Sequence, residues 1–121
     1  MQKHILIVDD VVEIRDLLEL FLSSQGYRVT TLEGADEALR VVHSDRPDLI
    51  ISDLQLEESD GLAMIEKLKV TLPDTPVILL TGVLFDAQVF RETLSKKVSA
   101  YLMKTTPLAK IKAEVERLLA V

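Results

Sequence analysis

The feature that most constrains this chain is a regular alternation between short apolar runs and longer segments of helical periodicity. Five runs have the length and residue types of strands: 5–8, 27–31, 49–51, 77–80 and 100–103. Between and after them, apolar residues recur at helical spacing over 14–22, 35–42, 62–72, 89–94 and 108–119. Strand starts about two dozen residues apart leave room for a helical crossover between parallel strands. The sequence therefore predicts an α/β fold with five parallel strands and helices on both faces of the sheet.

The polarity of the runs predicts the strand order. Runs 5–8, 49–51 and 77–80 are apolar at every position, as strands covered on both faces require. The run 27–31 is half polar and the run 100–103 is short, so both suit the edges. The resulting order, 2-1-3-4-5, is that of a flavodoxin-like doubly wound sheet. Ligands of such sheets bind at the carboxyl ends of the strands, where the strand order reverses.

Length and composition limit the class of protein. The 121 residues suit one domain, 1–121, with a real core. The chain has no cysteine. This excludes disulfides, thiolate zinc sites, iron–sulfur clusters and thiol nucleophiles. A net charge of −6 gives no general attraction to nucleic acid or anionic membranes. No run approaches the ~18 apolar residues of a membrane span, and the first residues lack a secretory signal. We expect a soluble cytoplasmic domain.

Polar side chains follow four of the five predicted strands. Asp9 and Asp10 end the first strand, and Asp53 ends the third. Thr81 ends the fourth, and Lys104 follows the fifth. Because parallel strands end at one edge of a sheet, we expect three carboxylates, a hydroxyl and an ammonium to converge there.

The predicted cluster of carboxylates suggests a cation site. At an effective dielectric constant of about 20, each close pair of carboxylates costs up to a few kcal/mol, so either some are protonated or a cation lies among them. Mg²⁺ is the natural candidate, because it is held by one or two carboxylates together with waters and phosphate oxygens. With a lysine and a threonine nearby, the set suits phosphoryl chemistry in which one carboxylate attacks in line.

Taken singly, these residues have ordinary structural interpretations. Asp10 can cap the helix that follows it, and Asp53 can be a turn residue. Thr106 can cap the last helix, with Pro107 in its first turn. Gly26 can end the first helix. The coincidence of polar residues at successive strand ends is what favours a functional site.

The ordered set of fragments resembles the receiver domain of two-component response regulators. The similarity extends over essentially the whole chain and rests on residues 5–10, 26–29, 37–39, 47–53, 60–62, 76–81 and 100–104. The resemblance implies that Asp53 accepts a phosphoryl group from the phosphohistidine of a kinase. Asp10 and Asp53 would bind Mg²⁺ directly with the main-chain carbonyl of Gln55, and Asp9 would act largely through water.

The resemblance also implies a switch. Lys104 would contact the phosphoryl group, and Thr81 would donate a hydrogen bond to one of its oxygens. Tyr101 would change rotamer together with Thr81, and the face formed by the fourth helix, fifth strand and fifth helix would respond. Gly82 would leave the phosphoryl site open.

Three positions depart from the receiver pattern. Thr105 replaces the proline that usually follows the lysine, which favours a trans bond after Lys104. Glu57 replaces a proline in the loop after the phosphoacceptor, so we expect an acidic entrance there. Lys97 and Val98 replace small residues before the last strand.

The resemblance favours a self-phosphorylating acceptor with slow hydrolysis of its phosphate over a turnover enzyme. The alternative is a non-phosphorylated interaction module of the same fold. An aspartyl-phosphate hydrolase would need Asp-x-Asp after the first strand, where this chain has Asp9-Asp10-Val11-Val12. A flavin binder would need a loop free of carboxylates there.

The implied partners are proteins. A sensor histidine kinase or a phosphotransfer protein would supply the phosphoryl group, and a downstream protein or output domain would receive the signal. A homodimer after phosphorylation is a further expectation. We expect no direct binding of nucleic acid and no membrane contact.

Overall fold

The computed structural model describes residues 2–53, 55–56, 59–82 and 98–120. Its main sheet has five parallel strands in the order β2-β1-β3-β6-β7. These strands are β1 (His4–Val8), β2 (Arg28–Leu32), β3 (Leu49–Ser52), β6 (Val77–Thr81) and β7 (Ala100–Met103). Since β6 and β7 are the fourth and fifth predicted strands, the predicted order 2-1-3-4-5 is confirmed.

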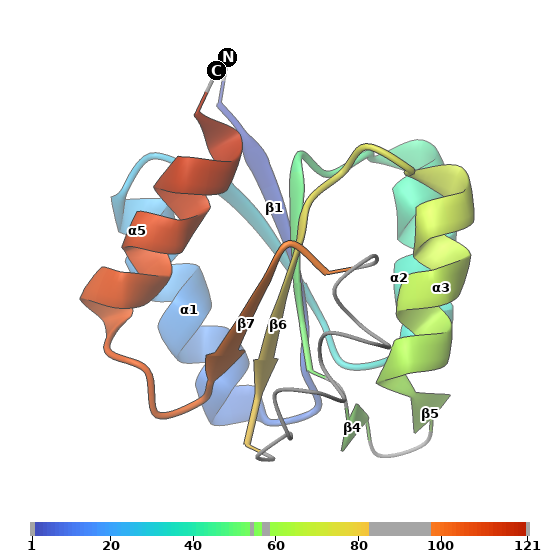
Figure 1. Ribbon diagram of the computed structural model, residues 1–121, viewed down its shortest axis with the longest axis horizontal. Coiled ribbons are helices and arrows are strands. Elements are labelled where there is room, and N and C mark those ends of the chain that lie inside the picture. The colour runs from blue at the N-terminus through green and yellow to red at the C-terminus, as the bar shows by residue number, and fades with distance from the viewer. Residues whose placement is uncertain (1, 54, 57–58, 83–97, 121) are drawn as a thin grey trace.

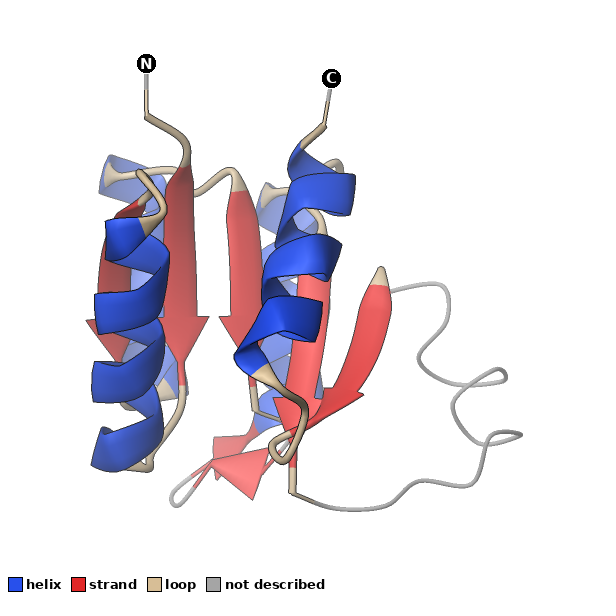
Figure 2. Cartoon of the chain, turned by 90° about the vertical axis from the view of Figure 1, so that its left-hand side faces the viewer, coloured by secondary structure: helices blue, strands red, loops and turns tan. Residues whose placement is uncertain are grey.

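Helices cover both faces of this sheet. They are α1 (Val12–Ser24), α2 (Ala35–Ser44), α3 (Gly61–Thr71) and α5 (Leu108–Leu119). Helices α1 and α5 lie on one face, and α2 and α3 lie on the other (Figure 1). The helix predicted over 89–94 lies outside the described residues. Figure 2 shows the strand arrows of the main sheet running the same way, so their carboxyl ends share one edge.

The central strand β1 is buried at all five positions. Leu6 and Val8 pack into the core under α2 and α3, whereas Ile5 and Ile7 pack into the core under α1 and α5. This alternation follows from the two-residue period of a strand. The two layers explain why the central runs are apolar throughout. The edge strands β2 and β7 are half-buried or exposed, as their mixed composition predicts.

A second, very short pair of strands was not predicted. Strands β4 (Gln55–Leu56) and β5 (Ser59–Asp60) pair antiparallel just before α3. Each has two residues, which is too few for a periodic pattern in the sequence. The pair follows Asp53, so it places regular backbone beside the carboxyl edge of the sheet.

The helix ends correct two details of the sequence prediction. Asp10 does not cap α1, because the residue before the helix is Val11 and no side chain caps it. Thr106 does not cap α5 either, since Pro107 takes the flanking position and the helix begins at Leu108. The predicted end of α1 is confirmed at Gly26, whose φ of +94° favours glycine.

No helix within the described ranges is both long and apolar enough to cross a membrane.

Candidate functional site: an acidic pocket at the carboxyl edge of the sheet

Main-chain hydrogen bonds hold the strand-end residues in place. The Asp9 N–H donates to the carbonyl of Leu32 at 3.0 Å, and the Asp53 N–H donates to that of Val8 at 3.0 Å. The Lys104 N–H donates to the carbonyl of Thr81 at 2.8 Å. The parallel ladder therefore continues one residue beyond the strands, and the sheet fixes the backbone of Asp9, Asp53 and Lys104.

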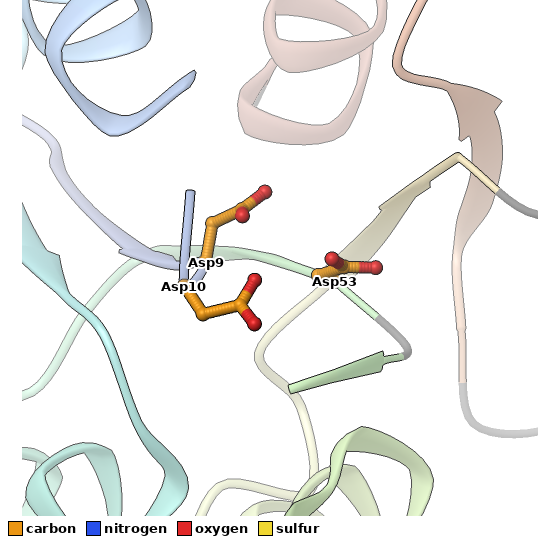
Figure 3. A group of neighbouring side chains, drawn as sticks. All are labelled: Asp9, Asp10 and Asp53. Carbon is orange, nitrogen blue, oxygen red and sulfur yellow. The ribbon is translucent and has the colours of Figure 1, made fainter. Parts of the chain in front are cut away.

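The three predicted carboxylates lie together. Each of Asp9, Asp10 and Asp53 offers one oxygen, and these oxygens are all within 4.8 Å of one another (Figure 3). Asp9 and Asp53 are buried, and Asp10 is half-buried. Carboxylates so close repel unless a cation lies among them. The site therefore needs positive charge.

Lys104 supplies part of that charge. Its Nζ lies 3.1 Å from Oδ2 of Asp9 and 2.8 Å from Oδ2 of Asp53, and its side chain is 18% exposed. Burial lowers the pKa of Lys104, but its hydrogen bonds to Asp53 and Asp9 outweigh this and raise the pKa above its ordinary value. The ammonium thus stays charged and bridges two of the three acids.

The environment of Asp9 disfavours the charged form of its carboxyl group. Burial raises the pKa of its carboxyl, and the hydrogen bond from the Val11 N–H and the nearby Lys104 offset this only in part. The bond to Asp9 from Val11 is 2.9 Å long, and Val11 is the residue that directly precedes α1. The carboxylate of Asp9 is therefore held by contacts within the protein, to the Val11 N–H and to Lys104.

Asp10 differs from its two neighbours. Within the described part of the chain, its carboxylate accepts no hydrogen bond and forms no ion pair, yet it lies beside Asp9 and Asp53. A half-buried carboxylate with this environment favours an external ligand of positive charge. Clustered carboxylate oxygens are the ligands that Mg²⁺ prefers. The donor set therefore fits this ion.

Thr81 and Tyr101 lie on the neighbouring strands β6 and β7. Thr81 is fully buried at the end of β6, and its register partner is Met103. Tyr101 is half-buried against the core under α2 and α3, and its hydroxyl donates to Sδ of Met103 at 3.4 Å. The sequence did not indicate this contact with Met103.

The departures from the receiver pattern have structural outcomes where they are described. The Lys104–Thr105 bond is trans, as expected without proline. Val98 is buried, while Lys97 and Glu57 lie outside the described residues. A Cβ added at Gly82 would lie 3.9 Å from Cδ of Lys104, which is ordinary van der Waals contact, so Gly82 lies beside the lysine. That this glycine keeps the phosphoryl site open stays a prediction.

Two further features concern the surroundings of the site. Gln55 begins β4, two residues after Asp53. Arg15, which the sequence analysis did not single out, donates from Nη1 to the main-chain oxygen of Asp9 at 2.6 Å. The only signal for it in the sequence was a cationic residue shortly after the acidic pair.

Comparison with known proteins agrees with this geometry. Residues 5–116 match the model of the response regulator receiver domain family. The chain is 44% identical over 79 residues to the transcriptional regulatory protein GlrR of Escherichia coli (strain K12), covering 65% of this chain and 18% of GlrR. It is 36% identical over 108 residues to the response regulator protein VraR of Staphylococcus aureus (strain Mu3), covering 88% of this chain and 51% of VraR. The chain thus spans about half or less of these relatives.

A solved structure extends the comparison to the fold. The response regulator protein TrrA of Thermotoga maritima, determined in complex with Mg²⁺ and BeF, has a TM-score of 0.85 and 33% sequence identity. The match covers 98% of this chain and 100% of TrrA. With the fold, the acidic pocket and the family match in agreement, this chain belongs to the receiver domain family of two-component response regulators.

Proposed function

We propose that residues 1–121 form a single receiver domain that accepts a phosphoryl group on Asp53 in a Mg²⁺-dependent reaction. The observation that carries this proposal is the position of Lys104, whose ammonium contacts Asp9 and Asp53 while Asp10 beside them keeps its carboxylate available. A metal ion held by the carboxylates would act together with the Lys104 ammonium to neutralise the charge of an incoming phosphoryl group.

The metal would be held by Asp10, Asp53 and the main-chain carbonyl of Gln55, with Asp9 acting through water. When bound, Mg²⁺ would supply charge neutralisation and orientation for the phosphoryl oxygens. A carboxylate oxygen of Asp53 attacks phosphorus as the bond from phosphorus to the imidazole nitrogen of the donor phosphohistidine breaks. After the transfer, the ammonium of Lys104 would contact the phosphoryl oxygens. This contact would replace its present contact with the carboxylate of Asp53.

The same site would switch the domain. The hydroxyl of Thr81 would donate to a phosphoryl oxygen, and Tyr101 on the adjacent strand would change rotamer with it. Because the phosphoryl group interacts differently with the two arrangements, phosphorylation shifts their populations. The responding face would include β7, α5 and the predicted helix over 89–94.

The partners follow from the family. Response regulators interact with histidine kinases and output domains, and we propose a sensor kinase or phosphotransfer protein as donor and a downstream protein, an output domain or a second copy as receiver. The name of GlrR describes a transcriptional regulatory protein. For this chain, with its net charge of −6, absence of direct nucleic-acid binding stays a prediction, as does a cytoplasmic location.

The test is phosphorylation by a small donor. Incubation with acetyl phosphate and Mg²⁺ should add one phosphoryl group to the protein, measured by intact mass. Asp53→Asn should abolish the gain, whereas Asp36→Asn, at an exposed carboxylate in the first turn of α2, should keep it. A gain retained in Asp53→Asn would show that the acceptor is misassigned. No gain in the wild type would favour the non-phosphorylated interaction module.

A further inference from the structure

Arg15 connects the second turn of α1 to the acidic pocket. Its side chain is half-buried, and its Nη1 lies 2.6 Å from the main-chain oxygen of Asp9. That oxygen belongs to the peptide group that joins Asp9 to Asp10. Arg15 therefore acts on the backbone between two of the three carboxylates.

This contact completes the fixation of Asp9. The N–H of Asp9 is held by Leu32, and its Oδ1 accepts a hydrogen bond from Val11. With the carbonyl held by Arg15, the plane of the next peptide group is set as well, because the group is rigid. The side chain of Asp10 leaves the backbone directly after this plane, and within the described residues no other contact orients its carboxylate.

The charge of Arg15 argues against a simple electrostatic role. Three carboxylates lie nearby, yet among the described residues the guanidinium forms no ion pair with them and donates to a carbonyl instead. A fixed cation beside a divalent metal site repels the metal. Charge alone would therefore weaken metal binding, so any strengthening has to come from the geometry that Arg15 imposes.

We infer that Arg15 is a positioning residue for the metal site: by holding the carbonyl of Asp9, it aims the carboxylate of Asp10 at the ion. The inference rests on the proposed function, since it requires that Mg²⁺ binds at these carboxylates. Contacts to the residues that support metal ligands commonly contribute a factor of 10–100 to affinity.

The test is the dissociation constant for Mg²⁺ alone, measured by isothermal titration calorimetry on the whole chain. Arg15→Met keeps the aliphatic stem but removes the donor and the charge, and we expect binding about 10-fold weaker. Arg15→Lys keeps a charged donor only one bond shorter and should restore most of the affinity. Arg15→Gln, whose amide is too short to reach the carbonyl, should behave like Arg15→Met and serves if the latter fails to fold. Arg28→Met removes the same charge from the opposite end of the sheet, where Arg28 pairs with Asp45, and should bind like the wild type.

The outcomes separate the explanations. Tighter or unchanged binding in Arg15→Met would overturn the inference, because a purely electrostatic role predicts tighter binding. Equal weakening in Arg28→Met would overturn it as well. A merely structural role would lower the urea stability of the metal-free variant and leave the dissociation constant unchanged. If the wild type bound no Mg²⁺, both the inference and the proposed metal site would fail, whereas loss of the Arg15 effect alone leaves the proposed function intact.

Discussion

At the scale of single residues, the adjacent acids Asp9 and Asp10 have carboxylates in different environments. The carboxylate of Asp9 is buried, accepts the hydrogen bond from Val11 and pairs with Lys104. Asp10 is half-buried beside it and joins the acidic cluster. The sequence could predict that both acids reach the pocket, since both follow a buried strand. It could not predict which of the two accepts the hydrogen bond from the Val11 N–H, because that depends on the backbone conformation between the strand and the helix.

The raised pKa of Asp9 predicts that this carboxylate destabilises the metal-free protein at neutral pH. The folded state binds the proton more tightly than the unfolded chain, so stability falls as the pH rises through and above the ordinary value of 3.8. Asp9→Asn, which can still accept from Val11, should raise the melting temperature at pH 7 by about 3 °C, measured by circular dichroism without divalent ions.

Two comparisons make the Asp9 prediction specific. The gain should vanish at a pH well below 3.8, where the carboxyl is protonated in both states. Asp16→Asn, at an exposed acid of α1, changes the charge equally and should give a smaller shift. A lower melting temperature for Asp9→Asn at pH 7 would contradict the assignment.

Lys104 should stabilise the fold by opposing the acidic cluster. Lys104→Met leaves Asp9 and Asp53 without their shared cation and should cost about 2 kcal/mol of unfolding free energy at pH 7, measured by urea titration. Since the pKa of Lys104 is raised, its contribution is complete below the ordinary value of 10.5 and is lost as the pH rises above the folded-state pKa. The difference between wild type and variant should therefore shrink in strongly alkaline solution.

The matched control for Lys104 is on the surface. Lys112→Met breaks an exposed pair with Glu116, whose charged atoms are 3.6 Å apart, and should cost no more than about 0.5 kcal/mol. A similar loss for both lysine variants would show that Lys104 acts only as surface charge.

At the scale of elements, burial patterns decide what each helix and strand contributes. The apolar runs predicted all five strands of the main sheet, and their polarity predicted which of them lie at its edges. The strands β4 and β5 escaped prediction, because two residues on each side form a pair through contacts that no local pattern encodes. Helix α1 was recognised by its apolar stripe, although that stripe does not show how far each leucine is buried.

Two leucines of α1 with different burial test how this helix packs on the sheet. Leu18 is 2% exposed and packs into the core under α1 and α5, whereas Leu20 is 74% exposed. Leu18→Ala should cost about 3 kcal/mol of unfolding free energy, and Leu20→Ala less than about 0.5 kcal/mol, both measured by urea unfolding. Equal losses would contradict the difference in burial between the two leucines, and a larger loss for Leu20→Ala would mean that α1 packs on the sheet by a different face.

At the scale of the whole molecule, the proposed Mg²⁺ site would couple metal binding to the stability of the fold. A ligand that binds only the folded state stabilises it by about 1.4 kcal/mol at ten times its dissociation constant. Millimolar Mg²⁺ should therefore raise the melting temperature, with sodium chloride of equal ionic strength as the control. Asp10→Asn should reduce this shift, and an unchanged shift would place the ion elsewhere.

The arrangement of the sheet has a consequence for the proposed phosphorylation of Asp53. The acids follow the lower ends of the strands in Figure 1, while β1 begins and α5 ends at the opposite edge. In longer relatives, a segment joined after the last helix would leave from that far edge. A five-residue strand spans about 17 Å. A conformational change that starts at a phosphorylated Asp53 would therefore have to extend over about that distance to reach a domain attached after α5. The proposed phosphorylation site and the attachment point of such a domain would thus lie at opposite edges of the sheet.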